Sequence, residues 1–180
     1  ETGVYAAISE RSEYMSEQFS ILIDSRTRFE TGEPGGVWLS MPTTTEQLHE
    51  AMQRVGITAD NPQDFLINGF MNTEQQPFDV PLPVIQRASV DELNYLGNLL
   101  SMQRDEDRDK FTAAVTLGER AGNIKDLINL AQNLDCYWLY PTVQNEEDYG
   151  YYLIDELDEL ELPEEAKKYF MYEDYGRDAA

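Results

Sequence analysis

Short apolar runs bounded by turn residues predict strands in the first half of the chain. Each run has the length and the β-branched or aromatic content of a strand, and the four are Val4–Ile8, Phe19–Ile23, Val37–Met41 and Phe65–Phe70. Before the third run, Gly32–Gly36 (GEPGG) supplies glycines that tolerate positive φ and a proline that fixes its own φ. We expect a hairpin loop there. A phosphate-binding loop is not expected, because no helix with a lysine follows directly.

Apolar residues at helical spacing predict a helix between the last two of these strands. Thr43 and Glu46 fit a capping box at its start, and Gly56 suits its end. The apolar stripe of this helix consists of Leu48, Met52 and Val55. His49 lies within it without a second histidine or a cysteine at ligand spacing, so we expect an ordinary helix residue. Strand, helix and strand together predict a small α/β unit.

Residues 71–83 are rich in glutamine and proline and predict a linker. Three short helices are expected after it. The first begins with a capping box of Ser89 and Glu92, the second follows Asp105 and runs to Gly118, and Asn123 caps the third. Their apolar positions are Leu93, Leu96 and Leu100, then Phe111, Ala114 and Val115, then Leu127, Ile128, Ala131 and Leu134. Brief connections between them predict a small helical bundle.

The C-terminal third mixes apolar and acidic residues. Cys136–Tyr140 (CYWLY) is aromatic and β-prone. Glu146–Glu161 reads as one amphipathic helix with Tyr149, Leu153, Leu157 and Leu160 on its apolar side. Pro163 then suits the first turn of another helix, with Glu164 and Glu165 near its positive end and Lys167 and Lys168 toward the other. No repeat of fixed period is visible.

These elements predict an α+β fold built as an elongated chain of three small domains. We expect an N-terminal α/β domain over 1–80, a helical middle domain over 81–122 and an acidic C-terminal α/β domain over 123–180. Aromatic residues near the C-terminus offer apolar material for a dimer interface, and the candidates are Tyr169, Phe170, Tyr172 and Tyr175.

Charge changes this picture more than any motif does. The 180 residues carry a net charge of −22, yet 41% are hydrophobic and 11% aromatic, which is enough to form a core. Between Glu146 and Ala180, thirteen acidic residues face three basic ones, and tyrosines and leucines are interspersed among them. We therefore expect this stretch to fold while it displays negative charge. Such a chain repels nucleic acid and anionic lipid, so its partners are expected to be basic or DNA-binding proteins.

Catalytic and metal-binding chemistry finds little support. Cys136 is the only cysteine, so we expect a buried thiol and no disulfide framework. Asp105, Asp107 and Asp109 alternate as in a calcium loop, but Lys110 and Thr116 stand where that loop needs glycine and glutamate. We find no phosphate-binding loop, no nucleophile elbow and no cysteine–histidine metal spacing. Neither a signal peptide nor an apolar run long enough to span a bilayer is present. No cofactor is expected.

A charge of −22 has a natural comparison in duplex DNA, which presents one negative charge per ~1.7 Å of axis. At that density the chain would match about 37 Å of duplex, or about 11 base pairs. The plainer interpretation is that the acids confer solubility only. An acidic adaptor for basic proteins without DNA-like geometry, and an undetected hydrolase, stay open as alternatives.

Several segments are similar to those of a known family. Asp126–Cys136, Glu147–Gly150, Leu162–Glu165 and Tyr172–Asp178 resemble the ArdA antirestriction proteins of mobile elements and phages. Gly36–Thr44, Phe65–Gly69 and Glu92–Leu96 look like earlier parts of that family. The resemblance implies three small domains in a row, a curved elongated homodimer, and mimicry of bent duplex DNA in the DNA-binding groove of type I restriction–modification enzymes. It also implies action in the cytoplasm of a bacterial host cell and no enzymatic activity.

Two departures from the family pattern stand out. Residues 9–35 look longer than its usual first hairpin, and the sequence stops at Ala180, where we expect a short further strand.

If mimicry is correct, outward carboxylates stand in for phosphates, and the candidates are Asp105, Asp107, Asp109, Glu147, Asp148, Asp155, Asp158, Glu159, Glu164 and Glu165. The alternative target is another DNA-binding defence system such as a CRISPR effector.

Overall fold

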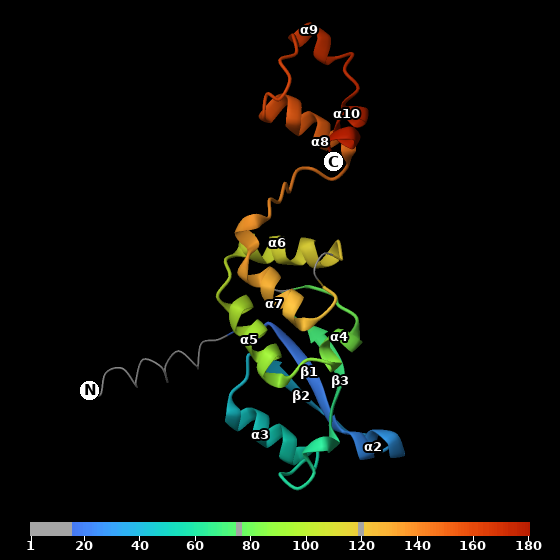
Figure 1. Cartoon of the computed structure of the whole chain (residues 1–180), viewed down its shortest axis with the longest axis vertical. Helices are drawn as coiled ribbons and strands as arrows, with labels where there is room; N and C mark the ends of the chain where they lie inside the picture. Colours follow the sequence, from blue (N-terminus) through green and yellow to red (C-terminus); the bar gives the residue numbers. More distant parts are fainter. Residues whose placement is uncertain (1–15, 75–76, 119–120) are drawn as a thin grey trace, which may run out of the picture. The chain divides into compact units, whose positions relative to one another are not determined.

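The computed structural model describes residues 16–74, 77–118 and 121–180 (Figure 1). The chain divides into two compact units, residues 1–137 and residues 138–180, called unit 1 and unit 2 below. The α+β class is confirmed by a three-stranded sheet and a set of helices. The three-domain arrangement is not confirmed. The predicted strand at Val4–Ile8 lies outside the described residues.

Unit 1 is built on an antiparallel sheet of β1 (Phe19–Ser25), β2 (Val37–Met41) and β3 (Phe65–Asn72) in the order β2-β1-β3. The three strands predicted there are thus confirmed. β1 is central, and its register aligns Ile21 with Leu39 on one side and with Phe70 on the other. Its alternate side chains Phe19, Ile21 and Ile23 are fully buried, which gives the sheet its core face.

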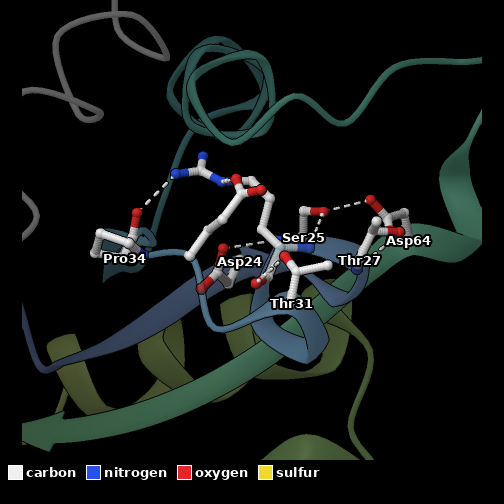
Figure 2. Close-up of polar contacts among 8 residues, drawn as sticks. Asp24, Ser25, Thr27, Thr31, Pro34 and Asp64 are labelled. Carbon is white, nitrogen blue, oxygen red and sulfur yellow. Dashed lines mark hydrogen bonds and ion pairs between the residues drawn. The ribbon is translucent and has the colours of Figure 1, made fainter.

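The connection from β1 to β2 contains a short helix that the sequence did not reveal, α2 (Arg26–Thr31). Ser25 caps it: its hydroxyl accepts a hydrogen bond from the Arg28 N–H at 3.3 Å. Asp64, from the 3-10 helix η1 (Pro62–Asp64), accepts hydrogen bonds from the Ser25 hydroxyl and from the Thr27 N–H, so two segments far apart in sequence meet at this helix start (Figure 2). The glycine-rich segment that was predicted as a hairpin loop follows α2 and completes the connection between the antiparallel strands β1 and β2.

Helix α3 (Thr45–Arg54) begins one residue later than predicted. Its capping box is Thr44 with Gln47, and the predicted pair of Thr43 and Glu46 is wrong. The backbone N–H of Thr43 is instead bonded to the Asn94 side chain at 2.6 Å, which fixes Thr43 outside the helix. Thr44 then has the extended backbone of an N-cap.

Two further predictions for α3 are met. Gly56 follows its end with a φ of +79°, the left-handed conformation that glycine favours. His49 is an exposed helix residue whose ring contacts the Gln53 amide at 2.9 Å, one turn along the helix.

The described residues of unit 1 that follow β3 contain four α-helices: α4 (Leu82–Gln86), α5 (Val90–Ser101), α6 (Asp105–Thr116) and α7 (Ile124–Gln132). The capping box of Ser89 with Glu92 and the Asn123 cap are confirmed. The predicted leucine stripe of α5 is fully buried. Helix α5 approaches the end of β2 at Gly97, where an added Cβ would lie 2.9 Å from the Pro42 nitrogen.

The predicted linker over 71–83 contributes to the core of unit 1. Phe78 and Val80 are 1% and 5% exposed. The Phe78 ring packs edge-on against Phe19 of β1 and Phe111 of α6, with ring centroids 5.8 Å and 5.3 Å apart. The sheet and the helices therefore share one hydrophobic core.

The end of unit 1 corrects the prediction for Cys136. Residues Leu134–Cys136 form a 3-10 helix, η2, and residues 137–140 form neither helix nor strand. A 3-10 helix repeats every three residues, so Leu134 and Tyr137 share its core-facing side while Cys136 lies on another. Cys136 is exposed, and the buried-thiol prediction is wrong.

Unit 2 consists of α8 (Glu146–Tyr151), the π-helical segment η3 (Tyr152–Glu156), α9 (Glu164–Lys167) and α10 (Tyr172–Ala179) (Figure 1). The described residues from 138 onward contain no strand, so the α/β character expected for this region is not found. The predicted helix over Glu146–Glu161 ends early. Asp158 adopts a left-handed φ of +49°, and the Glu159 N–H bonds back to the Leu153 carbonyl at 3.0 Å, closing the helix as a C-terminal cap does.

Candidate functional site

Negative charge is concentrated in unit 2. Thirteen acidic residues and three basic ones give its 43 residues a net charge of −10, whereas the 137 residues of unit 1 carry the remaining −12. Charge per residue is thus more than twofold higher in unit 2. The candidate functional site is its acidic surface.

The framework of this surface is the helix pair α8 and α10, which touch backbone to backbone. A Cβ added to Gly150 would lie 2.0 Å from the Tyr172 carbonyl oxygen, and one added to Gly176 would lie 1.8 Å from the Glu146 carbonyl oxygen. Real Cβ atoms do not approach other atoms this closely. Only glycine fits at both positions, so the two helices are fixed at close range.

This contact is reciprocal, and the sequence carries a matching signal that a search for periodic repeats misses. The tetrapeptide Glu-Asp-Tyr-Gly occurs at Glu147–Gly150 in α8 and again at Glu173–Gly176 in α10. Each glycine faces the carbonyl located four residues before the other glycine. The two copies are therefore related by an approximate local two-fold axis. Glu173 and Asp174 occupy positions equivalent to Glu147 and Asp148, and our sequence prediction of the acidic surface omitted them.

Aromatic and aliphatic side chains form the core beneath the helix pair. Leu153 and Ile154 are buried, and Tyr151 stacks on Tyr172 with ring centroids 3.8 Å apart. Phe170 packs against both Tyr172 and Tyr175. Burial raises the pKa of the Tyr172 and Tyr175 phenols. Of the four candidates for a dimer interface, Tyr172 is 6% exposed and packs inside unit 2, whereas Tyr169 is 79% exposed.

Most of the predicted phosphate-mimicking acids of unit 2 are exposed to solvent. The exposed ones are Glu147 in α8, Asp155 in η3, Asp158 and Glu159 after it, and Glu164 and Glu165 in α9. Asp148 is half-buried, and its carboxylate accepts a hydrogen bond from the Gln144 N–H at 3.1 Å, just before α8. Glu159 accepts one from the Tyr175 hydroxyl at 3.3 Å. These contacts limit how far the two side chains can move.

Basic residues contact some of these acids. The Lys167 ammonium lies 2.9 Å from the Asp155 carboxylate and 2.9 Å from the Glu164 carboxylate. Hydrogen bonds to these two acids raise the pKa of Lys167 above its ordinary value, so it is fully charged at neutral pH. In α10, the Arg177 guanidinium pairs with Asp174, and this pairing raises the pKa of Arg177. Lys168 lies over the ring of its neighbour Tyr169, 4.9 Å from the centroid.

The remaining predicted acids, Asp105, Asp107 and Asp109, are in α6 of unit 1 and occur among bases. Arg108 lies 3.5 Å from Asp105, and Arg104 lies 3.5 Å from Asp107. Residues 104–110 hold four acidic and three basic side chains, a net charge of −1. The first turn of α6 is acidic, as predicted for the positive end of a helix dipole. As a source of uncompensated negative charge, however, this segment is weak.

The potential metal-ligating residues in the described parts of the chain do not gather into a metal site. No group of three or more histidine, cysteine or acidic side chains there could hold a metal ion. The hydrogen bonds from Ser25 and Thr27 lower the pKa of Asp64 and account for this cluster as a helix cap (Figure 2). Among the helices that the structure describes, none has the length and apolar content to cross a membrane.

Comparison with known proteins gives a family. Residues 21–180 match the family model of the antirestriction protein ArdA. A comparison with curated proteins finds no match. The matched range begins in β1 and includes all of unit 2, so it covers both the sheet framework and the acidic surface.

Proposed function

Because this chain belongs to the ArdA antirestriction family, we propose that it inhibits a type I restriction–modification enzyme by mimicking duplex DNA. The family is one of inhibitors, not enzymes. The observation that carries the mimicry is the acidic surface of unit 2, where exposed carboxylates lie on the helical segments α8, η3 and α9 and on the turn that follows η3. In this proposal they occupy the positions of phosphates in the enzyme's DNA-binding groove.

Magnitudes are consistent with this role. Ten net charges correspond to about 17 Å of duplex, or about five base pairs, at the charge density of B-DNA. Carboxylates on a rigid surface attract the same lysines and arginines that bind phosphate, and their binding releases counterions. Affinity for the enzyme should therefore fall steeply as salt increases, as it does for DNA itself.

A competition measurement tests the proposal directly. A type I methyltransferase core is loaded with a fluorescent duplex that carries its recognition sequence, and the protein is titrated in at several salt concentrations. We expect stoichiometric displacement of the duplex and a linear decrease of log affinity with log salt. Absence of displacement by the folded protein would refute the proposal. Catalytic inactivation of the enzyme at far below one equivalent would contradict a purely binding mechanism.

Charge position is separated from total charge by two matched variants. The first replaces five exposed acids of unit 2 by their amides: Glu147, Asp158, Glu159, Glu164 and Glu165. The second replaces five exposed acids of unit 1: Glu30, Glu46, Asp60, Asp79 and Asp91. Both change the net charge from −22 to −17. We expect the first to lose inhibition by at least about tenfold, since each engaged phosphate analogue contributes to the salt-dependent term, and the second to retain most of it.

Two finer points belong to the proposal. A homodimer would double the length of DNA imitated, and Tyr169 offers it an exposed aromatic side chain. Sedimentation of the parent and of Tyr169→Ala tests this.

The other candidate target is a DNA-binding defence such as a CRISPR effector, and side-by-side assays of restriction and CRISPR interference in bacterial cells separate the two.

A further inference from the structure

We propose that Lys167 is a positioning residue for the acidic surface: it clamps Asp155 and Glu164 and so fixes the acidic loop between them. This inference rests on the proposed function, because its consequence is measured as inhibition. From its charge alone, Lys167 is expected to weaken binding to a basic groove. Here it is inferred to strengthen that binding.

The clamp joins two elements of unit 2. Asp155 lies in η3, where the helix that begins at Glu146 ends, and Glu164 begins α9. Lys167, in the last position of α9, reaches both carboxylates at 2.9 Å. Its side chain is 26% exposed, against 39% for Asp155 and 86% for Glu164. The Lys167 side chain is thus the least exposed of the three, and its ammonium contacts both acids.

The loop inside the clamp, residues 156–163, is strongly acidic. It holds four acids and no base: Glu156, Asp158, Glu159 and Glu161. Like charges at this density repel one another and favour an expanded loop. Within unit 2, the loop is also held by the Glu159–Tyr175 hydrogen bond and by the left-handed turn at Asp158. Lys167 closes it from the α9 side.

Lys167 places a positive charge within the acidic surface, and total charge and geometry predict different effects for it. If only total charge mattered, removing Lys167 would strengthen binding to a basic groove. If geometry matters more, its removal frees Asp155 and Glu164 and lets the loop expand, and the enzyme must then order these side chains on binding. The two accounts predict opposite signs for one substitution. This makes Lys167 a sharp test.

The experiment compares Lys167→Met with Lys168→Met in the full chain. Both variants lose one positive charge, so each has the same net charge, and the two substituted positions are adjacent in sequence. Lys168 is exposed and lies over the ring of Tyr169, away from the clamp. We expect K167M to displace DNA about three- to tenfold less well than the parent, from the cost of ordering freed side chains, whereas K168M matches or exceeds the parent. K167R, which keeps a donor to both acids, should recover most of the loss.

Salt dependence separates positioning from simple loss of folded protein. If freed acids no longer engage together, the slope of log affinity against log salt decreases in K167M. A variant that is merely less stable keeps the parent slope and recovers at lower temperature. Equal inhibition by K167M and K168M, or an unchanged slope, would overturn the inference.

A second pair of variants keeps the inference testable if K167M does not fold. Glu164→Gln and Glu165→Gln remove one charge each from adjacent exposed positions of α9. The clamp predicts a larger loss for E164Q, because Glu164 is held and Glu165 is outside the trio, and equal losses would refute it. Failure of the parent chain to displace DNA would instead refute the proposed function, so the two failures are distinguishable.

Discussion

Gly150 of α8 lies against the backbone of α10, and Gly176 of α10 lies against the backbone of α8. Neither position has room for a methyl group. Backbone atoms that would lie 1.8 Å and 2.0 Å from an added methyl carbon cannot move aside as a flexible side chain could. We therefore expect Gly150→Ala or Gly176→Ala to destabilise unit 2 by more than about 3 kcal/mol, above the usual cost of overpacking. Nuclear magnetic resonance spectra should lose the dispersed signals of unit 2 while keeping those of unit 1.

Gly122→Ala is the matched control for this substitution. A Cβ at Gly122 would meet only the Asp126 carboxylate, at 3.5 Å, an ordinary van der Waals contact. We expect the control to keep the spectra of both units. Unit 2 spectra that stay native in G150A and G176A would show that α8 and α10 are not held at this range.

The corrected start of α3 can be measured by comparing adjacent threonines. Thr44→Ala removes the hydroxyl that accepts the Gln47 N–H at 3.2 Å, and loss of such a cap costs about 1 kcal/mol. Thr43→Ala leaves that acceptor in place and removes only the long hydroxyl contacts to the Gln47 Oε1 at 3.3 Å and the Thr44 carbonyl at 3.4 Å, so it should cost a few tenths of a kcal/mol. Urea denaturation followed by circular dichroism distinguishes them. If Thr43→Ala lost more stability than Thr44→Ala, the capping box would be the pair of Thr43 and Glu46 predicted from the sequence.

The Asp64 cap predicts a pH dependence with a definite sign. Hydrogen bonds from Ser25 and Thr27 lower the pKa of Asp64 in the folded chain. A lowered folded pKa means that the stabilisation is present above the unfolded value of about 4 and is lost as pH falls through the folded value. Asp64→Asn should therefore lower the melting temperature of unit 1 at pH 7, and the difference should shrink as pH falls below about 4. Asp60→Asn, at an exposed position outside this cluster, should show neither effect.

The parts of the fold that the sequence predicted are those whose signals are local. The three strands of unit 1, the capping box at Ser89 and the stripe of Leu93, Leu96 and Leu100 each follow from residues a few positions apart. For helix α2, the local cap signal of Ser25 was not used, and the second acceptor at this helix start, Asp64, lies 39 positions from Ser25. Phe78 looked like part of a linker because prolines surround it, and only packing against Phe19 and Phe111 shows its burial.

In unit 2 the sequence predicted acidity but not geometry. Helical periodicity continued through Leu157 and Leu160, yet these side chains are 50% and 43% exposed because the helix closes at Asp158. Aspartate is an unusual residue for that left-handed position, so no glycine marked the end. The repeated Glu-Asp-Tyr-Gly is a signal of the helix pair, but it becomes meaningful only with the reciprocal contact of its two glycines.

The acids of α6 provide the last test, because sequence and structure rank them differently. By density, Asp105 and Asp109 look equal to any acids of unit 2, yet residues 104–110 carry a net charge of only −1. A basic groove gains little from a segment that brings its own arginines and lysine, since those charges repel it at the same range. We expect D105N/D109N to weaken DNA displacement by less than about twofold, near the effect of exposed charges screened at physiological salt, and D158N/E159Q to weaken it more. Asparagine keeps the left-handed conformation accessible at position 158, so the second variant changes charge without reopening the helix end. Equal losses in the same competition assay would mean that α6 also engages the enzyme, and that its ion pairs open on binding.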